Sequence, residues 1–330
     1  MKSSYSLLQH LSHEQFISGN ALGSALGVSR AAVWKMVKHC MDVTGVDIFS
    51  VKGKGYCLAQ PLELLSEAVI RQHLSASCHD CVAKIEVVSR CDSTNTQLHR
   101  RGAGLDSGTI LFAEQQTAGR GRNGRSWISP FAQNLYFSMY WRSNLPIMAL
   151  SGFSLALGVV VLRGLKELGF VQEIGLKWPN DILYQGAKLA GFLVEILGEA
   201  NGTASLIIGV GINVKMDKLQ GELIDQRWTD LSTINDAICL SRNSLAATMV
   251  NQICILQEVF SAQGFQSYRE EWIAHDCFHR LPVDLFTSDG IIQGIEDGVD
   301  ESGALQLIIN GEQHKIYSGD VSLRIKGSLQ

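Results

Sequence analysis

The sequence lacks the features that would place it in a membrane, a secretory pathway or a disordered class. No apolar run approaches the roughly 18 residues of a membrane-spanning helix. The first five residues, Met-Lys-Ser-Ser-Tyr, lack an apolar stretch and a small-residue cleavage site. Charged residues make up 18% and hydrophobic residues 46% of 330 positions, which favours a large folded core. We therefore predict a cytoplasmic protein of two or three domains with no membrane partner.

The sequence also has few cysteines or histidines at the spacing of metal-binding pairs. Of eight cysteines, only Cys78 and Cys81 have the CxxC spacing of zinc sites, and no second CxxC follows. Ordinary reduced cysteines of a cytosolic protein are the favoured interpretation. We expect no metal held by protein ligands alone.

Acidic residues are missing from one long window. Residues 115–166 contain no Asp or Glu, although the whole chain has 32 of them. The same window carries Arg120, Arg122, Arg125, Arg142, Arg163 and Lys166. Residues 1–64, by contrast, form a small head with six basic and four acidic residues. The window predicts a site for an anionic ligand, and the basic head hints at a polyanion.

The pattern of the chain predicts an α+β protein of several domains. We expect a head at residues 1–64, a central mixed α/β domain at 65–277 and a small β-barrel at 278–330. Helices are expected at 5–16, 18–27, 30–43, 147–168 and 245–262. Strands are expected at 46–51, 55–58, 84–89, 109–114, 134–141, 176–178, 182–184, 191–197 and 205–210.

The head has the layout of a winged helix-turn-helix. Gly27 would lie in the tight turn, and Ser29 would begin a second helix with an apolar back and a polar front. A basic hairpin tip would form the wing. The candidate DNA-binding residues are Ser29, Arg30, Trp34, Lys35, Lys38, Lys52 and Lys54. A small interaction domain without a role in DNA binding is the alternative.

A glycine-rich loop carries three of the arginines of the acid-free window. Residues 119–124, Gly-Arg-Gly-Arg-Asn-Gly, match the dinucleotide fingerprint G-x-G-x-x-G. That fingerprint requires a helix directly after it and an acid about 20 residues later, and neither is expected here. Arginines on mobile glycines instead indicate a loop that closes over a phosphate or carboxylate. A solvated basic loop is the alternative interpretation.

Further short motifs lie near the ends of expected strands. These are Asp-Ser-Thr-Asn at 92–95, Lys-Trp-Pro-Asn-Asp at 177–181, Lys-Leu-Ala-Gly at 188–191 and Gly-Val-Gly-Ile-Asn at 209–213. Each alone is weak, because a helix cap, a turn or a close backbone approach explains it. In this order, together with the arginine-glycine loop, Gly-Lys-Gly-Tyr at 53–56 and Ser-Arg-Ala-Ala at 29–32, they resemble the bifunctional biotin ligase/biotin operon repressor family.

The resemblance implies an SH3-like C-terminal barrel and a two-step reaction. Biotin and ATP, with Mg²⁺, would form biotinoyl-5′-AMP and pyrophosphate. Biotin would then pass to a lysine of the biotin carboxyl carrier protein of acetyl-CoA carboxylase. The adenylate would also act as corepressor, favouring a homodimer that binds operator DNA. This chain departs from the pattern of that family at Asn123, inside the arginine-glycine loop, and at Phe192, directly after the Lys-Leu-Ala-Gly motif.

The resemblance also assigns roles to residues. Biotin would contact Ser93, Thr94, Asn95, Gln116, Arg120, Gly121, Arg122 and Lys188. The adenylate would contact Gly119, Trp127, Asn213 and Trp228. The catalytic candidates are Arg120, Arg122, Lys188 and Asp181, because cations must offset the repulsion between the biotin carboxylate and the phosphates. A biotin-sensing repressor without ligase activity and a lipoate-type ligase remain the alternative functions.

Overall fold

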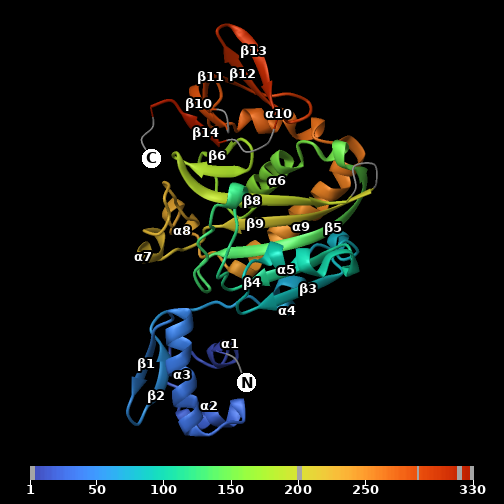
Figure 1. Cartoon of the computed structure of the whole chain (residues 1–330). Coiled ribbons are helices and arrows are strands. Elements are labelled where there is room, and N and C mark those ends of the chain that lie inside the picture. Colours follow the sequence, from blue (N-terminus) through green and yellow to red (C-terminus); the bar gives the residue numbers. More distant parts are fainter. Residues whose placement is uncertain (1–3, 199–202, 288–289, 318–321, 328–330) are drawn as a thin grey trace.

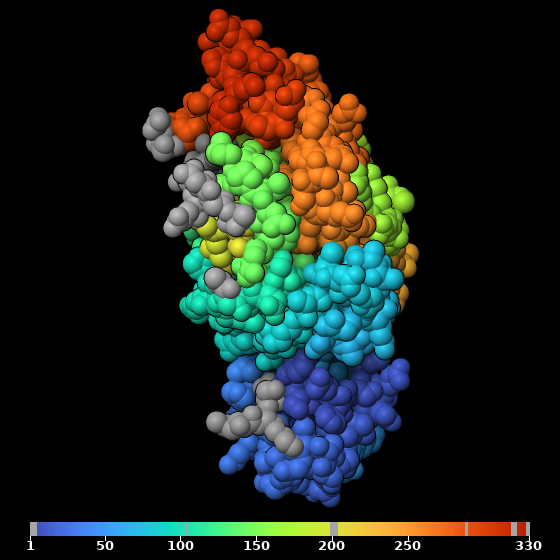
Figure 2. Space-filling model, turned by 90° about the vertical axis from the view of Figure 1, so that its right-hand side faces the viewer, coloured from blue at the N-terminus to red at the C-terminus, as the bar shows by residue number. Residues whose placement is uncertain are grey.

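A computed structural model of the chain describes residues 4–198, 203–287, 290–317 and 322–327. Three parts follow one another along the long axis of the molecule. The N-terminal head lies at one end, the central body in the middle and a C-terminal sheet at the other end (Figures 1 and 2).

The head contains three helices and a hairpin, as the sequence predicts. They are α1 (Ser4–Leu8), α2 (Gly19–Leu26), α3 (Arg30–Thr44), β1 (Ile48–Val51) and β2 (Gly55–Leu58). The turn between α2 and α3 is formed by Gly27 at φ 61° and by Ser29, whose hydroxyl accepts a hydrogen bond from the amide of Ala32 at 3.2 Å. The expected helix-turn-helix is therefore present.

The expected first helix over residues 5–16 is wrong in length. The helix ends at Leu8, and the following segment pairs with the hairpin instead. The amide of Leu58 donates to the carbonyl of Ser12 at 2.8 Å, and Ile17 forms an antiparallel bridge with Tyr56. Tertiary pairing thus overrides a helical pattern that was weak by itself.

The central body is built on a seven-stranded sheet in the order β3-β4-β5-β9-β8-β7-β6. Its strands are β3 (Lys84–Val88), β4 (Thr109–Ala113), β5 (Leu135–Pro146), β6 (Ile174–Lys177), β7 (Asp181–Tyr184), β8 (Ala187–Leu197) and β9 (Thr203–Ile212). Only β3 and β4 run parallel, and every other neighbouring pair is antiparallel. This topology confirms that the glycine fingerprint does not begin a dinucleotide-binding fold.

Helices cover the two faces of this sheet unequally (Figure 1). The helices are α4 (Glu67–Gln72), α5 (Thr94–Arg101), α6 (Phe153–Glu167), α7 (Lys218–Gly221), α8 (Leu231–Ile234), α9 (Arg242–Gln263) and α10 (Gln266–Ala274). Four short 3₁₀ turns span Ala76–Cys78, Gly102–Gly104, Arg122–Gly124 and Ile147–Leu150. Helices α6 and α9 pack together over one face, while α5 contacts β4, β5 and β9. Alternate residues of β9 serve the two faces: Leu206 and Ile208 join the large core, and Ile207 joins the cluster under α5.

The expected helix over residues 147–168 is interrupted. A 3₁₀ turn precedes Gly152, and α6 begins only at Phe153. Gly152 has φ 77°, and a Cβ there would lie 2.6 Å from the ring of Phe265. Both 147–167 and α9 are long and apolar enough to cross a membrane, but most of each is buried in the protein core.

The C-terminal part is an antiparallel sheet of five strands in the order β13-β12-β11-β10-β14. Its strands are β10 (Pro282–Thr287), β11 (Gly290–Val299), β12 (Leu305–Ile309), β13 (Glu312–Ile316) and β14 (Ser322–Ile325). The Ser-Asp-Gly sequence at residues 288–290 predicts a turn between β10 and β11, and residues 288 and 289 lie outside the described part of the chain. Val283, Leu285, Val299 and Leu305 join the large core, so this sheet packs firmly on the body.

The head touches the body through the segment that follows the arginine-glycine loop. Phe131 and Ala132 are buried in the hydrophobic cluster of the head rather than in that of the body. The hydroxyl of Tyr5 donates to the carbonyl of Leu65 at 2.6 Å, and burial raises the pKa of Tyr5 to about 12. The head is therefore packed directly against the body at Phe131, Ala132 and Leu65.

Candidate ligand-binding site

The floor of the site is a flat patch of three glycines on β8 and β9. Gly191 pairs with Gly211, and Leu193 pairs with Gly209, across the two strands. A Cβ at Gly209 would lie 2.2 Å from the Oδ1 atom of Asn95, and one at Gly211 would lie 2.6 Å from the ring of Trp127. The missing side chains leave room for these two polar and aromatic groups, as the sequence suggested for residues 209–213.

A buried polar cluster lies at one end of this floor. The Ser138 hydroxyl donates to Oδ1 of Asn95 at 2.5 Å, and its oxygen lies 2.7 Å from the hydroxyl of Thr94. The Nδ2 group of Asn95 donates to the carbonyl of Leu193 at 3.0 Å. The amide and hydroxyl of Thr94 both donate to Oε1 of Gln116, at 2.8 and 3.2 Å. Together these contacts form an oriented set of donors and acceptors of the kind that recognises a small polar ring.

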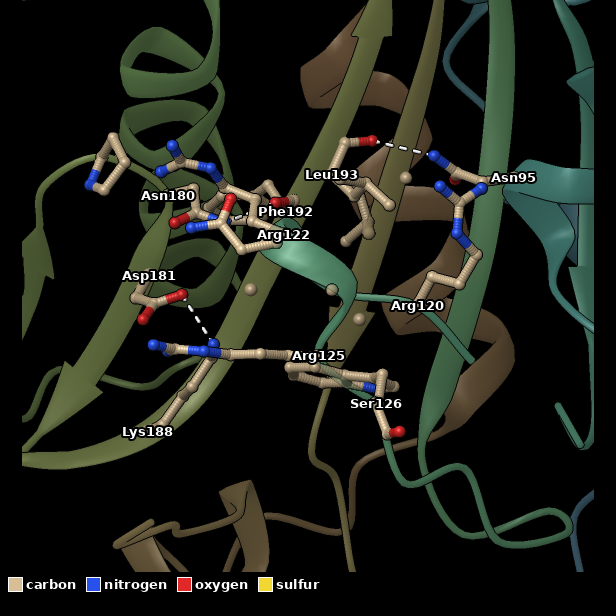
Figure 3. A pocket seen from close by; sticks show the side chains of 18 of the residues that line it. Asn95, Arg120, Arg122, Arg125, Ser126, Asn180, Asp181, Lys188, Phe192 and Leu193 are labelled. Carbon is tan, nitrogen blue, oxygen red and sulfur yellow. Dashed lines mark hydrogen bonds and ion pairs between the residues drawn. The ribbon is translucent and has the colours of Figure 1, made fainter. Parts of the chain in front are cut away.

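The arginine-glycine loop crosses in front of this cluster. Arg120 forms an ion pair with Glu195 at 3.2 Å, and Figure 3 shows its guanidinium beside Asn95. Arg122 lies farther along the loop, toward Asn180. Asn123 has the left-handed backbone conformation, φ 54° and ψ 36°, which Asn tolerates better than most residues. The loop is thus placed over the pocket, as expected of a mobile anion-binding element.

Cations gather at the other end of the floor. Lys188 forms an ion pair with Asp181 at 2.7 Å, and its Nζ atom lies 5.3 Å from the centre of the Trp127 ring. The side chains of Lys188 and Asp181 are 17% and 14% exposed, so the pair is largely shielded from water. Figure 3 shows the two side chains meeting across the cavity. A shielded lysine beside an arginine loop is suited to binding phosphate or carboxylate.

Lys177 adds a further charge to this end. Its burial lowers the pKa of its ammonium, and the nearby cations Lys188, Arg125 and Arg324 lower it further. The Asp181 carboxylate acts in the opposite direction. An anionic ligand placed among these groups would relieve the repulsion between them.

A second cavity continues from the first. The two share Arg125, Ser126, Trp127, Lys188 and Gln226, and the second is also lined by Leu223, Ile224, Asp225 and Trp228. The indole Nε1 atom of Trp127 is buried and has no hydrogen-bond partner within the described part of the chain. A buried donor without an acceptor is rare, so this end of the site fits a ligand that supplies an acceptor.

The two other residues predicted at this end serve mainly to shape it. The Nδ2 group of Asn213 donates to the carbonyl of Thr229 at 3.0 Å, which holds β9 against the following segment. The indole of Trp228 donates to the carbonyl of Gly221 at 3.0 Å. Both residues line the second cavity.

Most of the residues proposed from sequence therefore meet in one place. The first cavity is lined by Ser93, Thr94, Asn95, Gln116, Arg120, Gly121, Arg122, Trp127, Asp181 and Lys188. Gly119, the first residue of the loop, does not line the cavity, and a Cβ there would lie 2.4 Å from the carbonyl of Trp127. Ser93 also caps α5, and its hydroxyl accepts from the amide of Thr96 at 3.5 Å.

Sequence reasoning missed four residues of the site. Ser138 and Glu195 lie in strands, where alternation would have placed them on the face of Gly209, given the correct pairing. Asn180 and Lys177 stood in a motif that was noted but were not proposed as site residues. The Asn180 Nδ2 group donates to the carbonyl of Phe192 at 2.6 Å.

The head residues form a separate candidate site. Ser29, Arg30, Trp34, Lys35, Lys38, Lys52 and Lys54 are all exposed. Trp34 is 56% exposed, which is unusual for a large aromatic side chain and is typical of a residue in a binding surface. The buried side of α3 is formed by Val33, Val37 and Cys40.

Fold and site together define a class of protein: a helix-turn-helix head joined to a body whose glycine-floored pocket is lined by cations suited to a small anionic ligand. Known proteins narrow this class. Residues 87–213 match the model of the biotin/lipoate A/B protein ligase family. Residues 282–324 match the biotin protein ligase C-terminal domain, and residues 4–57 match a helix-turn-helix domain.

Relatives of similar length give the same result. The bifunctional ligase/repressor BirA of Escherichia coli is 40% identical over 96% of this chain and 96% of its own length. The protein of the same name from Bacillus subtilis is 30% identical over 94% of each chain. The structure of biotin protein ligase from Aquifex aeolicus in complex with biotin and ATP is 29% identical, with a TM-score of 0.64, over 74% of this chain and 100% of that one. This chain belongs to the BirA family of bifunctional ligase/repressors.

Proposed function

We propose that this protein is a biotin ligase and a biotin-dependent repressor. It activates biotin with ATP to biotinoyl-5′-AMP and pyrophosphate, and it transfers biotin from this adenylate to the lysine of a biotin carboxyl carrier protein of acetyl-CoA carboxylase, releasing AMP. The observation that supports this best is the single pocket in which a polar cluster, an arginine loop and Lys188 meet. The complex of the Aquifex aeolicus relative with biotin and ATP supports the choice of substrates.

The residues have distinct tasks in this proposal. Thr94, Asn95, Gln116 and Ser93 hold the polar ring of biotin, while the glycine floor accommodates the rest of the ligand. Arg120, Gly121 and Arg122 close over the carboxylate and the α-phosphate. Lys188 neutralises charge where the carboxylate attacks phosphorus, and Asp181 keeps the Lys188 ammonium in place at 2.7 Å.

The second cavity receives the adenylate end. Trp127, Asn213 and Trp228 line it, Gly119 lies against the carbonyl of Trp127, and the buried indole donor of Trp127 would find an acceptor there. Mg²⁺ would enter with the triphosphate and supply positive charge to its oxygens. Closure of the loop shields the mixed anhydride, which water would otherwise hydrolyse.

Exchange of radioactive pyrophosphate into ATP tests the first half-reaction. Exchange that depends on biotin and not on lipoate supports the ligase. Exchange with lipoate alone would identify a lipoate-type ligase. Binding of biotin without exchange would identify a sensor that lacks ligase activity.

The glycine floor allows a sharp test of biotin recognition. In Gly209→Ala, the new Cβ would lie 2.2 Å from Oδ1 of Asn95, so the amide must leave its network. We expect biotin affinity to fall about 10- to 100-fold by calorimetry, because one or two hydrogen bonds are lost. Gly104→Ala is the control, since a Cβ there meets nothing within 4 Å. Unchanged affinity in Gly209→Ala would contradict the placement of biotin beside Asn95.

The head is proposed to bind operator DNA when adenylate favours a homodimer. Its hairpin would act as a wing, with Lys52 and Lys54 on phosphates, and α3 would present Ser29, Arg30, Trp34, Lys35 and Lys38 to the groove.

A gel-shift experiment at low salt with biotinoyl-5′-AMP tests this role. Arg30→Ala combined with Lys35→Ala is expected to weaken operator binding about 10- to 100-fold. The same variant should keep its pyrophosphate exchange. Wild-type affinity for DNA in the double variant would remove this role from α3.

Finer structural assignments belong to the same proposal. The borders at 64/65 and 277/278 separate a winged head, a ligase domain and an SH3-like barrel. A cytoplasmic location follows from the carrier protein and the DNA that the protein is proposed to bind.

A further inference from the structure

Three potential metal ligands meet where the body joins the C-terminal sheet, away from the pocket lining. They are Asp276, His279 and Glu296, and one ligand atom of each lies within 4.8 Å of the other two. The Nδ1 atom of His279 lies 3.8 Å from Oε2 of Glu296. This distance is too long for a hydrogen bond but close to the roughly 3.4 Å between two ligands on one tetrahedral zinc ion.

The backbone conformation brings these three side chains together. Asp276 and His279 come from the turn after α10, and Glu296 comes from β11. The register of β11 against β12 shifts between Glu296 and Val299, so a bulge turns Glu296 inward. The amide of Arg280 donates to the carbonyl of Glu296 at 2.9 Å, which fixes the two segments together.

In each carboxylate, one oxygen accepts a hydrogen bond from a backbone amide, and the other oxygen accepts none from a described N–H or hydroxyl group. The amide of Gly298 donates to Oε1 of Glu296 at 2.6 Å, and the amide of Phe278 donates to Oδ1 of Asp276 at 2.9 Å. Oε2 of Glu296 and Oδ2 of Asp276 are buried and accept no hydrogen bond from an N–H or hydroxyl group of another described residue, while the two carboxyl groups face one another. Carboxylate ligands of metals are usually held by such hydrogen bonds to their second oxygen.

The two acids also lack a compensating cation. The Glu296 side chain is 0% exposed, and no Lys or Arg in the described ranges forms an ion pair with it or with Asp276. Two facing carboxyl groups in this environment must share a proton or hold a positive ion.

We propose that Asp276, His279 and Glu296 bind one divalent transition-metal ion, for which zinc is the best match. Zinc accepts both imidazole nitrogen and carboxylate oxygen as ligands, and a water molecule would complete a tetrahedral shell around it. His279 is exposed, which gives the ion a path of entry. Mg²⁺ is a poorer match, because it prefers a shell made of oxygen alone.

The ion would join the C-terminal sheet to the strand that leads into the ligand pocket. Asp276 forms a parallel bridge with Leu176 of β6, and the amide of Cys277 donates to the carbonyl of Leu176 at 2.8 Å. Lys177 follows directly, and its ammonium lies 5.6 Å from the centre of the Phe278 ring. We therefore assign the ion a structural role that stabilises this junction.

Calorimetric titration of the full-length, tag-free protein tests the proposal. The protein is stripped with EDTA, transferred to metal-free buffer and titrated with ZnCl₂, with MnCl₂ and MgCl₂ in parallel. We expect one Zn²⁺ per chain, and at least tenfold weaker binding in both Glu296→Gln and His279→Gln. Asp297→Asn is the matched control, because Asp297 is adjacent on β11 but pairs with Arg280 at 2.7 Å.

A second measurement separates loss of the site from loss of folding. Zn²⁺ at a concentration that just saturates the wild type should raise the melting temperature of the wild type and of Asp297→Asn, and that of Glu296→Gln much less. Stripped Glu296→Gln should melt no lower than stripped wild type, because it loses one of two facing acids. Cys81→Ser should keep zinc binding, which excludes the thiols of the CxxC segment as the site.

Three outcomes would overturn the assignment. One is the absence of zinc binding in the wild type, which would leave a carboxyl pair that shares a proton. Another is unchanged zinc affinity in Glu296→Gln. The third is loss of zinc binding in Cys81→Ser alone.

Discussion

Replacing Lys188 with methionine is expected to slow biotin-dependent pyrophosphate exchange by about 10²- to 10³-fold, the usual loss when one charge-stabilising group is removed from a reacting centre. Methionine has nearly the length of lysine but no charge, so the substitution removes the ammonium and little of the packing. The prediction rests on the proposed adenylation of biotin. It is measured as the rate of exchange at saturating biotin and ATP.

The position of Lys188 explains why so large an effect is expected. Its side chain lines both cavities, and only 17% of it is exposed. Water cannot readily replace its charge there, and the carboxylate and phosphate that must approach each other are both negative. Biotin binding at equilibrium should change much less than the rate, because the charge matters most as the new bond forms.

Two other variants make the result specific. Lys84→Met removes an exposed lysine far from the pocket and should exchange at the wild-type rate. Asp181→Asn keeps the size of the partner at 2.7 Å and should slow exchange less than Lys188→Met. An exchange rate within threefold of wild type in Lys188→Met would remove Lys188 from the reaction. Wild-type rates of both half-reactions in Asp181→Asn would remove Asp181.

The parts of the fold that the sequence predicts well depend on local chemistry. Ser18 and Ser29 cap α2 and α3 as expected, since a hydroxyl before an apolar stripe has one favourable conformation. The pairing of β1 with β2 follows from two short strand-like segments on either side of the basic turn at residues 52–54. Local signals fail at residues 9–16, where Leu58 and Tyr56, distant in sequence, supply the backbone partners.

The sequence motifs predicted which residues belong to the site, but they did not predict how the strands bring them together. The order of the motifs pointed to Asn95, Arg120 and Lys188, which do line one cavity. Ser138 could not be found, because its role depends on its pairing with Gly209 across β5 and β9. Glu195 was missed for the same reason, although it pairs with Arg120 at 3.2 Å.

The cluster at the C-terminal junction shows this limit most clearly. The CxxC spacing of Cys78 and Cys81 drew attention, while Glu296, twenty residues beyond Asp276, gave no spacing signal. A bulge in β11 brings Glu296 to the cluster, and bulges leave little trace in a sequence. Distant ligands that are joined only by tertiary structure need coordinates to be seen.

Removal of the Arg242 guanidinium is expected to destabilise the whole junction between head and body. Arg242 pairs with Glu114 at 2.7 Å, and the two side chains are 6% and 0% exposed. Arg242→Met would leave the Glu114 carboxylate buried without a cation, which costs about 3–5 kcal/mol. We expect the urea midpoint, followed by circular dichroism, to fall accordingly.

The loss should exceed that of a single contact because Arg242 joins three segments. Its Nη1 group donates to the carbonyl of Glu63 at 2.8 Å, and its Nε group donates to the carbonyl of Asn134 at 3.1 Å. The other oxygen of Glu114 accepts from the amide of Leu65 at 2.6 Å. The linker from the head, the strand before the pocket loop and the chain after that loop therefore meet at one ion pair.

A double variant distinguishes the buried charge from simple loss of packing. Glu114→Gln combined with Arg242→Met removes both charges and should recover part of the lost stability, because no unpaired ion remains. Arg71→Met, which breaks an exposed pair with Glu67, should change stability by at most about 0.5 kcal/mol. If Glu114→Gln lowered stability as much in the Arg242→Met background as in the wild type, the two side chains would contribute to stability independently. The head would then be held to the body by the packing of Phe131 and Ala132 rather than by the paired charges.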